Sequence, residues 1–186
     1  MNSRNTRCAL AVGLIALLLA FSGCAMFSRD YHEAKTYDLK VTGSSQLPVQ
    51  LKRLRNLSGT DIRFWSQLDA VQVASDEYAR WRLSPDMMLE RAVMEYFRPD
   101  AATYEIDMNA VLTRFEFDLV SHQAVFSWQV QLTCKDQTVK TTGRFTAPID
   151  GDRPDDAAAA MSRCLDQALA DVAAKAAQLV PAADAK

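Results

Sequence analysis

The sequence predicts an α+β fold, with an antiparallel sheet of about five to six strands and two helices packed on one face of the sheet. Apolar and polar residues alternate through much of residues 37–149, which is typical of half-buried strands. Residues 84–97 and 154–179 instead repeat their apolar side chains at helical spacing. A short connection at 135–138 joins the last two strands, which indicates an antiparallel hairpin.

The first half of the sheet is predicted to consist of short strands separated by turns. Residues 42–45 (TGSS) and 56–61 (NLSGTD) carry the Gly, Ser, Asn and Asp residues that favour turns and loops. The segments between them read as extended, in this order: 37–41, 47–54, and then 62–68 and 70–75 on either side of Asp69.

The first helix is predicted over residues 84–97. Ser84 is a suitable N-cap, Pro85 suits the first helical position, and Asp86 favours the positive end of the helix dipole. Pro99 then ends the helix. One face is expected to pack on the sheet, because it collects the apolar residues Met88, Leu89, Ala92, Val93, Tyr96 and Phe97.

Three long strands follow this helix. In the first, Phe115 and Phe117 fall out of phase with the apolar residues before them, so a bulge near 111–114 is expected to return both rings to the core. The strands at 124–134 and 139–149 alternate throughout. Their polar residues are expected to leave one face of the sheet in solvent: Ser127, Gln129, Gln131, Thr133, Lys140, Thr142, Arg144 and Thr146.

The last helix is predicted from about Pro154 to Leu179, and Pro181 follows its end. Cys134 lies on the apolar face of its strand, and Cys164 borders the apolar stripe of this helix. A disulfide between them would close a loop of about 30 residues and stabilise the fold by roughly 3–4 kcal/mol. Two buried, unpaired thiols are the equally supported alternative.

Residues 1–23 resemble a bacterial lipoprotein signal peptide. Arg4 and Arg7 precede the apolar run 9–20, and the segment ends on Ser-Gly-Cys24, as in a lipobox. Cleavage would leave Cys24 with a diacylglyceryl group on its sulfur, and with two or more acyl chains the anchor holds firmly. Residues 24–36 would then form an acylated tether, and residues 37–181 a single domain.

A retained membrane span is the alternative for the N-terminus, because about 20 apolar residues cross the hydrocarbon core of a bilayer. Residues 8–28 carry no charge, but Ser22, Gly23 and Ser28 make a poor lipid-facing surface. In enteric-type bacteria an Asp after the acylated cysteine retains a lipoprotein in the inner membrane. Ala25 takes that place here, so the resemblance implies a cell-envelope protein that faces the periplasm from the outer membrane.

Charge and motifs exclude several classes of function. The chain has 21 basic and 23 acidic residues, and loss of the signal peptide brings the formal charge to −4, which does not suit a nucleic-acid binder. His32 and His122 have no neighbours at metal-ligand spacing, and the acidic stretch 150–156 lacks the spacing of a calcium loop. The chain also shows no nucleophile elbow or phosphate-binding glycine loop. Catalytic residues, metals and cofactors are therefore not expected.

One local feature could contact a partner. Arg80 and Arg82 flank Trp81 immediately before the first helix. Trp and Arg are enriched at interface hot spots, so these three residues form a candidate partner-binding patch. The alternative is a Trp that closes the junction between sheet and helix while the arginines stay solvated.

Several short motifs follow one another along the chain: Cys24, Tyr37 and Leu39, Trp81 followed by Ser84-Pro85, the strand end Arg114–Asp118 (RFEFD) and an alanine-rich last helix. In this order they resemble the ABC-type transport auxiliary lipoprotein family, the PqiC-like proteins. The resemblance covers about residues 37–179. Thr36 departs from it, because such proteins often have a second Tyr there.

The resemblance implies a non-catalytic periplasmic component of a lipid or solute transport system that bridges two membranes. Its partners would be an ABC transporter permease and ATPase, reached through a periplasmic subunit of the mammalian-cell-entry (MCE) type, and a homo-oligomer would fit the same role. Two alternatives are a structural or assembly lipoprotein, such as a pilotin or secretion-apparatus component, and a small carrier that holds lipid between sheet and helices.

Overall fold

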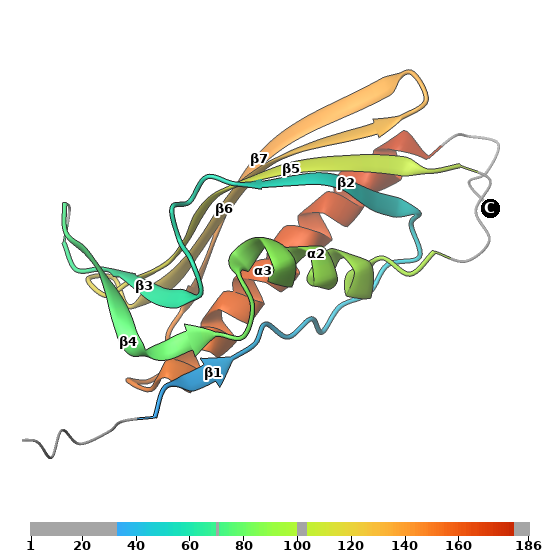
Figure 1. Cartoon of the computed structure of the whole chain (residues 1–186). Coiled ribbons are helices and arrows are strands. Elements are labelled where there is room, and N and C mark those ends of the chain that lie inside the picture. Colours follow the sequence, from blue (N-terminus) through green and yellow to red (C-terminus); the bar gives the residue numbers. More distant parts are fainter. Residues whose placement is uncertain (1–32, 70, 100–103, 181–186) are drawn as a thin grey trace, which may run out of the picture. The chain divides into compact units, whose positions relative to one another are not determined.

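The computed structural model describes residues 33–69, 71–99 and 104–180. These residues form seven strands, two α-helices and a short 3-10 helix (Figure 1). In chain order the elements are β1 (Lys35–Tyr37), β2 (Val49–Asn56), β3 (Arg63–Gln67), β4 (Val73–Trp81), α2 (Pro85–Tyr96), β5 (Ile106–Asp118), β6 (Gln123–Cys134), β7 (Gln137–Pro148), α3 (Pro154–Ala176) and η2 (Ala177–Leu179).

The sheet is mixed, so the predicted antiparallel sheet is wrong. Its strand order is β1-β4-β3-β5-β6-β7, and β2 also pairs with β5. Three pairs are antiparallel (β3/β4, β5/β6 and β6/β7), whereas β1/β4, β2/β5 and β3/β5 are parallel. The strand count is seven rather than five or six.

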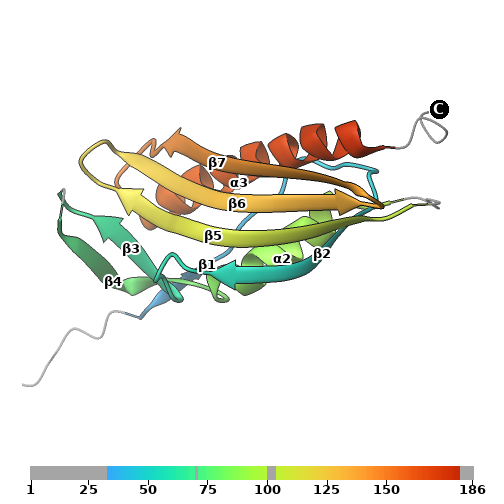
Figure 2. The same ribbon diagram turned by 90° about the horizontal axis from the view of Figure 1, so that it is seen from above.

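The long strand β5 explains the mixed topology. Its first half, from Ile106 to Leu112, pairs with β2, while its end at Phe117 and Asp118 pairs with β3. Figure 2 shows β2 alongside β5, with β6 and β7 following on the other side. A parallel pair needs a crossover connection, and the segment with β3, β4 and α2 provides it between β2 and β5. Alternation along a strand shows that one face is buried but does not give the direction of its neighbour.

Several local predictions are confirmed. The register of β5 against β6 shifts between Leu112 and Arg114, within the predicted bulge, and both Phe115 and Phe117 are buried. Strand β6 buries every even residue from Ala124 to Cys134. Both helices begin at the predicted prolines. In α3 the carboxylate of Asp156 accepts a hydrogen bond from the backbone N–H of Arg153 (3.2 Å), which stabilises the first turn.

The early strands differ from the prediction. Strand β1 ends at Tyr37, where a strand over 37–41 was expected, and β4 continues to Trp81 rather than ending at residue 75. In β1, Lys35 and Tyr37 pair with Ala79 and Trp81 of β4. The Arg80–Arg82 segment therefore lies at the end of a paired strand and not in a free loop.

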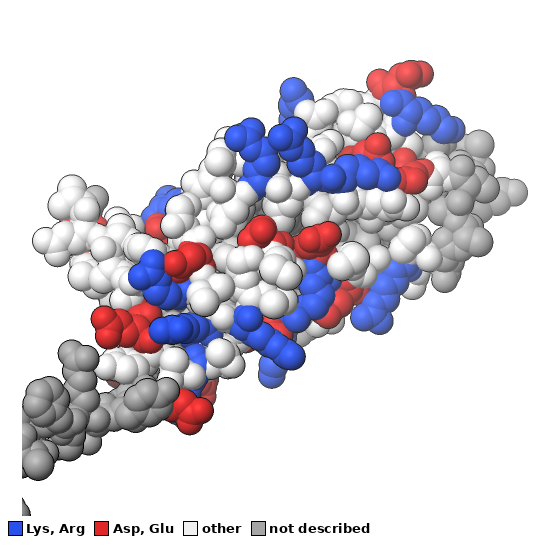
Figure 3. All heavy atoms as spheres, viewed as in Figure 1, with Lys and Arg blue, Asp and Glu red and all other residues white. Residues whose placement is uncertain are grey.

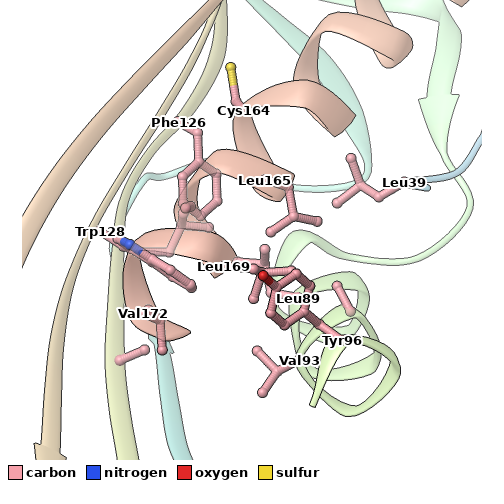
Figure 4. Packing of buried hydrophobic residues seen from close by; sticks show 14 of the residues in the cluster. Leu39, Leu89, Val93, Tyr96, Phe126, Trp128, Cys164, Leu165, Leu169 and Val172 are labelled. Atoms are coloured by element: carbon pink, nitrogen blue, oxygen red, sulfur yellow. The ribbon is translucent and has the colours of Figure 1, made fainter. Parts of the chain in front are cut away.

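The hydrophobic core fills the space between the sheet and the two helices. Helix α3 packs along β6 and β7, and α2 packs on β2. Figure 4 shows Trp128 of β6 beside Val172 of α3, while Leu169 faces Leu89 and Val93 of α2. All five are buried, so close packing of apolar side chains holds these layers together.

Candidate functional site: the open face of the sheet

The sheet face opposite the core is built from aligned polar side chains. The register places residues of β2, β5, β6 and β7 in two cross-strand rows. The first row is Arg55, Val111, Gln129 and Thr142, and the second is Arg53, Asn109, Gln131 and Lys140. Because side chains directly opposite one another on a sheet face are neighbours, these eight residues form one continuous surface.

This surface is hollowed. An open depression of about 420 Å³ is lined by both rows. Arg53 and Arg55 stand on the β2 side and Lys140 on the β7 side, while the amides of Asn109, Gln129 and Gln131 lie between them. Figure 3 shows Lys and Arg side chains gathered over β2 and β5. We call this surface, with the adjacent Arg144 of β7, the cationic hollow.

The cations of the hollow have no carboxylate partners among the residues that the structure describes. No acidic residue lines the depression. Arg53, Arg55, Lys140 and Arg144 make no ion pair within the described ranges. Four unneutralised cations on one sheet face create a positive potential that attracts an anionic partner.

Cations at the two ends of the same face are neutralised. Lys52 forms an ion pair with Glu105, and its Nζ lies 3.5 Å from Asp107 Oδ1. At the other end Arg114 pairs with Glu116 and donates to Gln67 Oε1 (2.9 Å). The unpaired positive charge is therefore confined to the middle of the sheet.

The chemistry of the hollow suits carboxylates or phosphates. Arginine presents a planar fork of donors that matches both groups, and the neighbouring amides and Thr142 add neutral donors and acceptors. The floor offers no nucleophile paired with a base. The arrangement can bind and orient an anionic group.

The predicted partner patch at Arg80, Trp81 and Arg82 needs correction. Trp81 is only 2% exposed, and its ring lies 4.4 Å from that of Phe64 and 5.2 Å from that of Phe115, between ring centroids. A buried indole in an aromatic cluster cannot contact a partner, so the junction-closing alternative is the right one for Trp81. Arg80 and Arg82 do remain exposed.

The two cysteines are free and buried, as in the second of the two sequence interpretations. The Cys164 thiol donates to the carbonyl of Ala124 (3.5 Å), whereas Cys134 lies ten residues farther along the same strand. Ten strand residues span about 33 Å, far beyond the roughly 7 Å between Cα atoms that a disulfide allows. Burial raises the pKa of the Cys164 thiol to about 11, which keeps it protonated and unreactive.

The acidic stretch at 150–156 is a turn followed by a helix start. Asp150 accepts from Arg163 (2.8 Å), and Asp156 caps the first turn of α3. Within the described ranges, no three His, Cys, Asp or Glu side chains are grouped as a metal site. His122 lies in the β5–β6 turn with its Nε2 atom 3.7 Å from Asp152, and His32 lies outside the described residues.

The interior is too well filled for the proposed lipid carrier. The side chains between sheet and helices, including Met88, Phe126, Met161 and Leu165, are fully buried against one another. A hollow of about 220 Å³ opens beside the start of α3, between Phe64 and Pro154. It falls below the roughly 300–1,000 Å³ of ordinary ligand pockets.

The predicted anchor lies outside the described residues, since Cys24 and most of the 24–36 tether fall before residue 33. Within the described part of the chain, no helix has the length and apolar character needed to cross a membrane.

Comparison with known proteins shows a shared fold. The chain is similar to the crystal structure of an uncharacterized protein, with 14% identity and a TM-score of 0.62, over 77% of this chain and 98% of that one. It is also similar to protein XCC0632 from Xanthomonas campestris, of family DUF330, with 14% identity and a TM-score of 0.60, over 74% and 92%. No family model and no curated protein matches the sequence.

Sequence reasoning missed the cationic hollow. The polar faces of β6 and β7 were expected to be exposed, but their alignment with Arg53 and Arg55 depends on the parallel pairing of β2 with β5. The sequence of residues 51–55 (LKRLR) could have indicated this arrangement. A bulge at Lys52 places both Leu51 and Leu54 on the core side of β2. The two arginines then share the opposite face.

Proposed function

We propose that the protein is a non-catalytic lipoprotein of the bacterial cell envelope. Anchored through Cys24 and facing the periplasm from the outer membrane, it would serve as an auxiliary component of an ABC-type intermembrane transport system. The proposal rests mainly on the cationic hollow, a surface of cationic and amide side chains that can bind an anionic group and has no nucleophile paired with a base. The lipobox supports the anchor, and the fold shared with a DUF330 protein is compatible with this role.

The hollow favours an acidic helix of the periplasmic MCE-type subunit as its occupant. Between β2 and β7 lie three strand spacings, or about 14 Å. An α-helix with side chains is about 10–12 Å wide, so it fits between the two cationic rims. Glutamates and aspartates on such a helix would meet Arg53 and Arg55 on one side and Lys140 on the other.

The anchor and the hollow would act together. Acyl chains on Cys24 hold the domain near one membrane, and this raises the effective concentration of the hollow for any partner that reaches that membrane. A contact of modest affinity is then sufficient to connect the two membranes. No chemical step is required of the protein, whose part would be to dock and position the transport subunit.

Photo-crosslinking in the native bacterium tests this function. A benzoylphenylalanine at position 129, in the middle of the hollow, is expected to crosslink to a periplasmic subunit encoded beside an ABC permease and ATPase. The matched control is position 94 on α2, where Met94 is 62% exposed away from the hollow, and it should give no such product. Crosslinks from position 129 to a secretin or pilus subunit would instead support an assembly lipoprotein.

A further inference from the structure

Two hairpin turns form an exposed apolar end of the molecule. The β3–β4 turn presents Val71, and the β5–β6 turn presents Val120, with 86% and 72% of their surfaces exposed. Leu68, Val73 and Leu119 beside them are also exposed. The backbone N–H of Leu119 donates to the carbonyl of Gln67 (3.1 Å), so the two turns lie side by side. We call these five residues the apolar tip.

The tip carries few charged side chains. Each turn has one aspartate, whose carboxylate accepts hydrogen bonds from backbone N–H groups of the same turn. Asp69 accepts from the N–H groups of Val71 and Gln72 (both 2.8 Å), and Asp118 accepts from those of Val120 and Ser121 (3.0 and 3.1 Å). Figure 3 shows this end of the molecule as a mostly uncharged lobe. Exposed apolar side chains grouped in this way mark a contact surface.

The direction of β1 shows from which side the chain enters the domain. Strand β4 leaves the tip at Val73, and β1 runs parallel to it, so the chain enters Lys35 from the side of the tip. Figures 1 and 2 both place β1 in the same half of the molecule as the β3–β4 turn. The predicted acylated tether was expected to run over residues 24–36, but Lys35 and Thr36 belong to β1, so residues 24–34 are the part of it that precedes the strand.

The length of the tether allows the tip to reach the bilayer. Residues 24–34 number eleven, and an extended segment of that length spans at most about 40 Å. Along β4 the tip lies six residues before Ala79, the partner of Lys35, which is about 20 Å. A domain anchored at Cys24 can therefore rest its tip on the membrane without straining the tether.

We propose that the apolar tip inserts into the lipid interface of the membrane that anchors the protein, an inference that rests on the proposed lipoprotein function. The side chains of Val71 and Val120 enter the boundary between headgroups and acyl chains. The acyl anchor alone leaves the domain free to rotate, whereas a second contact fixes its orientation. The cationic hollow, on the open sheet face, is then held in one orientation for its partner.

The test uses the mature, acylated chain in vesicles of phosphatidylethanolamine and phosphatidylglycerol. Val71→Cys, Val120→Cys and the control Met94→Cys are each labelled with an environment-sensitive fluorophore. Labelling is specific because Cys134 and Cys164 are buried and Cys24 is acylated. On vesicles, the probes at positions 71 and 120 should shift to the blue and lose quenching by iodide, while the probe at position 94 stays quenched.

Three results would overturn the inference, and they separate it from the proposed function. If all three probes stay quenched while the protein floats with the vesicles, the tip does not insert although the anchor stands. Protection of positions 71 and 120 without vesicles would show that a second copy of the chain covers the tip. If the chain does not float with the vesicles at all, neither the acyl anchor nor the tip binds the membrane, and both proposals are wrong.

Discussion

Trp81→Ala is expected to lower the free energy of unfolding by about 3–5 kcal/mol, the range for removing a large aromatic side chain from a core. Trp81 is almost fully buried, and Phe64, Phe115 and Phe117 surround its ring. Truncation leaves a cavity among the aromatic side chains that β3, β4 and β5 contribute to the core. Urea unfolding followed by circular dichroism measures the effect without depending on tryptophan fluorescence.

Arg82→Ala is the matched control for that variant. Its side chain is 70% exposed, and the nearest carboxylate, that of Asp38, lies 3.9 Å from its Nη1 atom. An exposed pair of this kind contributes little, so the stability should change by less than about 1 kcal/mol. Equal stability of the Trp81→Ala variant and the wild type, with loss of partner binding, would contradict the assignment of Trp81 to the core.

Arg53→Glu/Arg55→Glu is expected to weaken binding to the periplasmic transport subunit at least about 100-fold. A hydrogen bond between charged groups contributes roughly 1.5–3 kcal/mol, and each 1.4 kcal/mol corresponds to a factor of ten in affinity. Reversal of both charges removes two such contacts and adds repulsion from the acidic partner. Isothermal titration calorimetry with the purified subunit gives the dissociation constant.

Lys40→Glu/Arg98→Glu controls for net charge. Both residues are exposed and lie outside the hollow, and the change in formal charge is the same. This variant should bind within a few-fold of the wild type, because screening limits the effect of distant surface charges. Equal losses of affinity for both double variants would show that net charge alone drives binding. No loss for either variant would show that the cationic hollow does not bind the subunit.

Local sequence signals predicted much of the fold. Pro85 and Pro154 fixed the starts of both helices, and the phase change before Phe115 located a bulge that the structure confirms. The alternation from Ala124 to Cys134 correctly placed the even-numbered residues in the core, but Ser127, which was expected in solvent, is buried. These features depend on neighbours within one element, which a sequence displays directly.

Pairing between distant segments could not be predicted in the same way. The parallel pairing of β2 with β5 depends on where the crossover connection returns the chain to the sheet. Because this pairing was not predicted, the sheet was wrongly expected to be antiparallel. For Trp81 the sequence left two interpretations, a partner contact between two arginines and a Trp that closes the sheet–helix junction, and the strand alternation of β4 turns it inward, as in the second. Val71 was expected within a strand, but the structure places it in an exposed turn.

The cationic hollow and the apolar tip would have complementary roles. The hollow carries unpaired cations on a rigid sheet, and the tip carries exposed apolar side chains at the ends of two hairpins. A surface of the first kind recognises an anionic protein segment, whereas one of the second kind favours a lipid interface. Both roles depend on the domain being held at a membrane.

Mass spectrometry of the mature protein from its native membrane tests this anchoring most directly. We expect a chain that begins at Cys24 and carries a diacylglyceryl group on the sulfur, with or without an additional N-acyl chain. A chain that retains Met1, or that has an unmodified thiol at Cys24, would show that the protein is not anchored through acyl chains on Cys24.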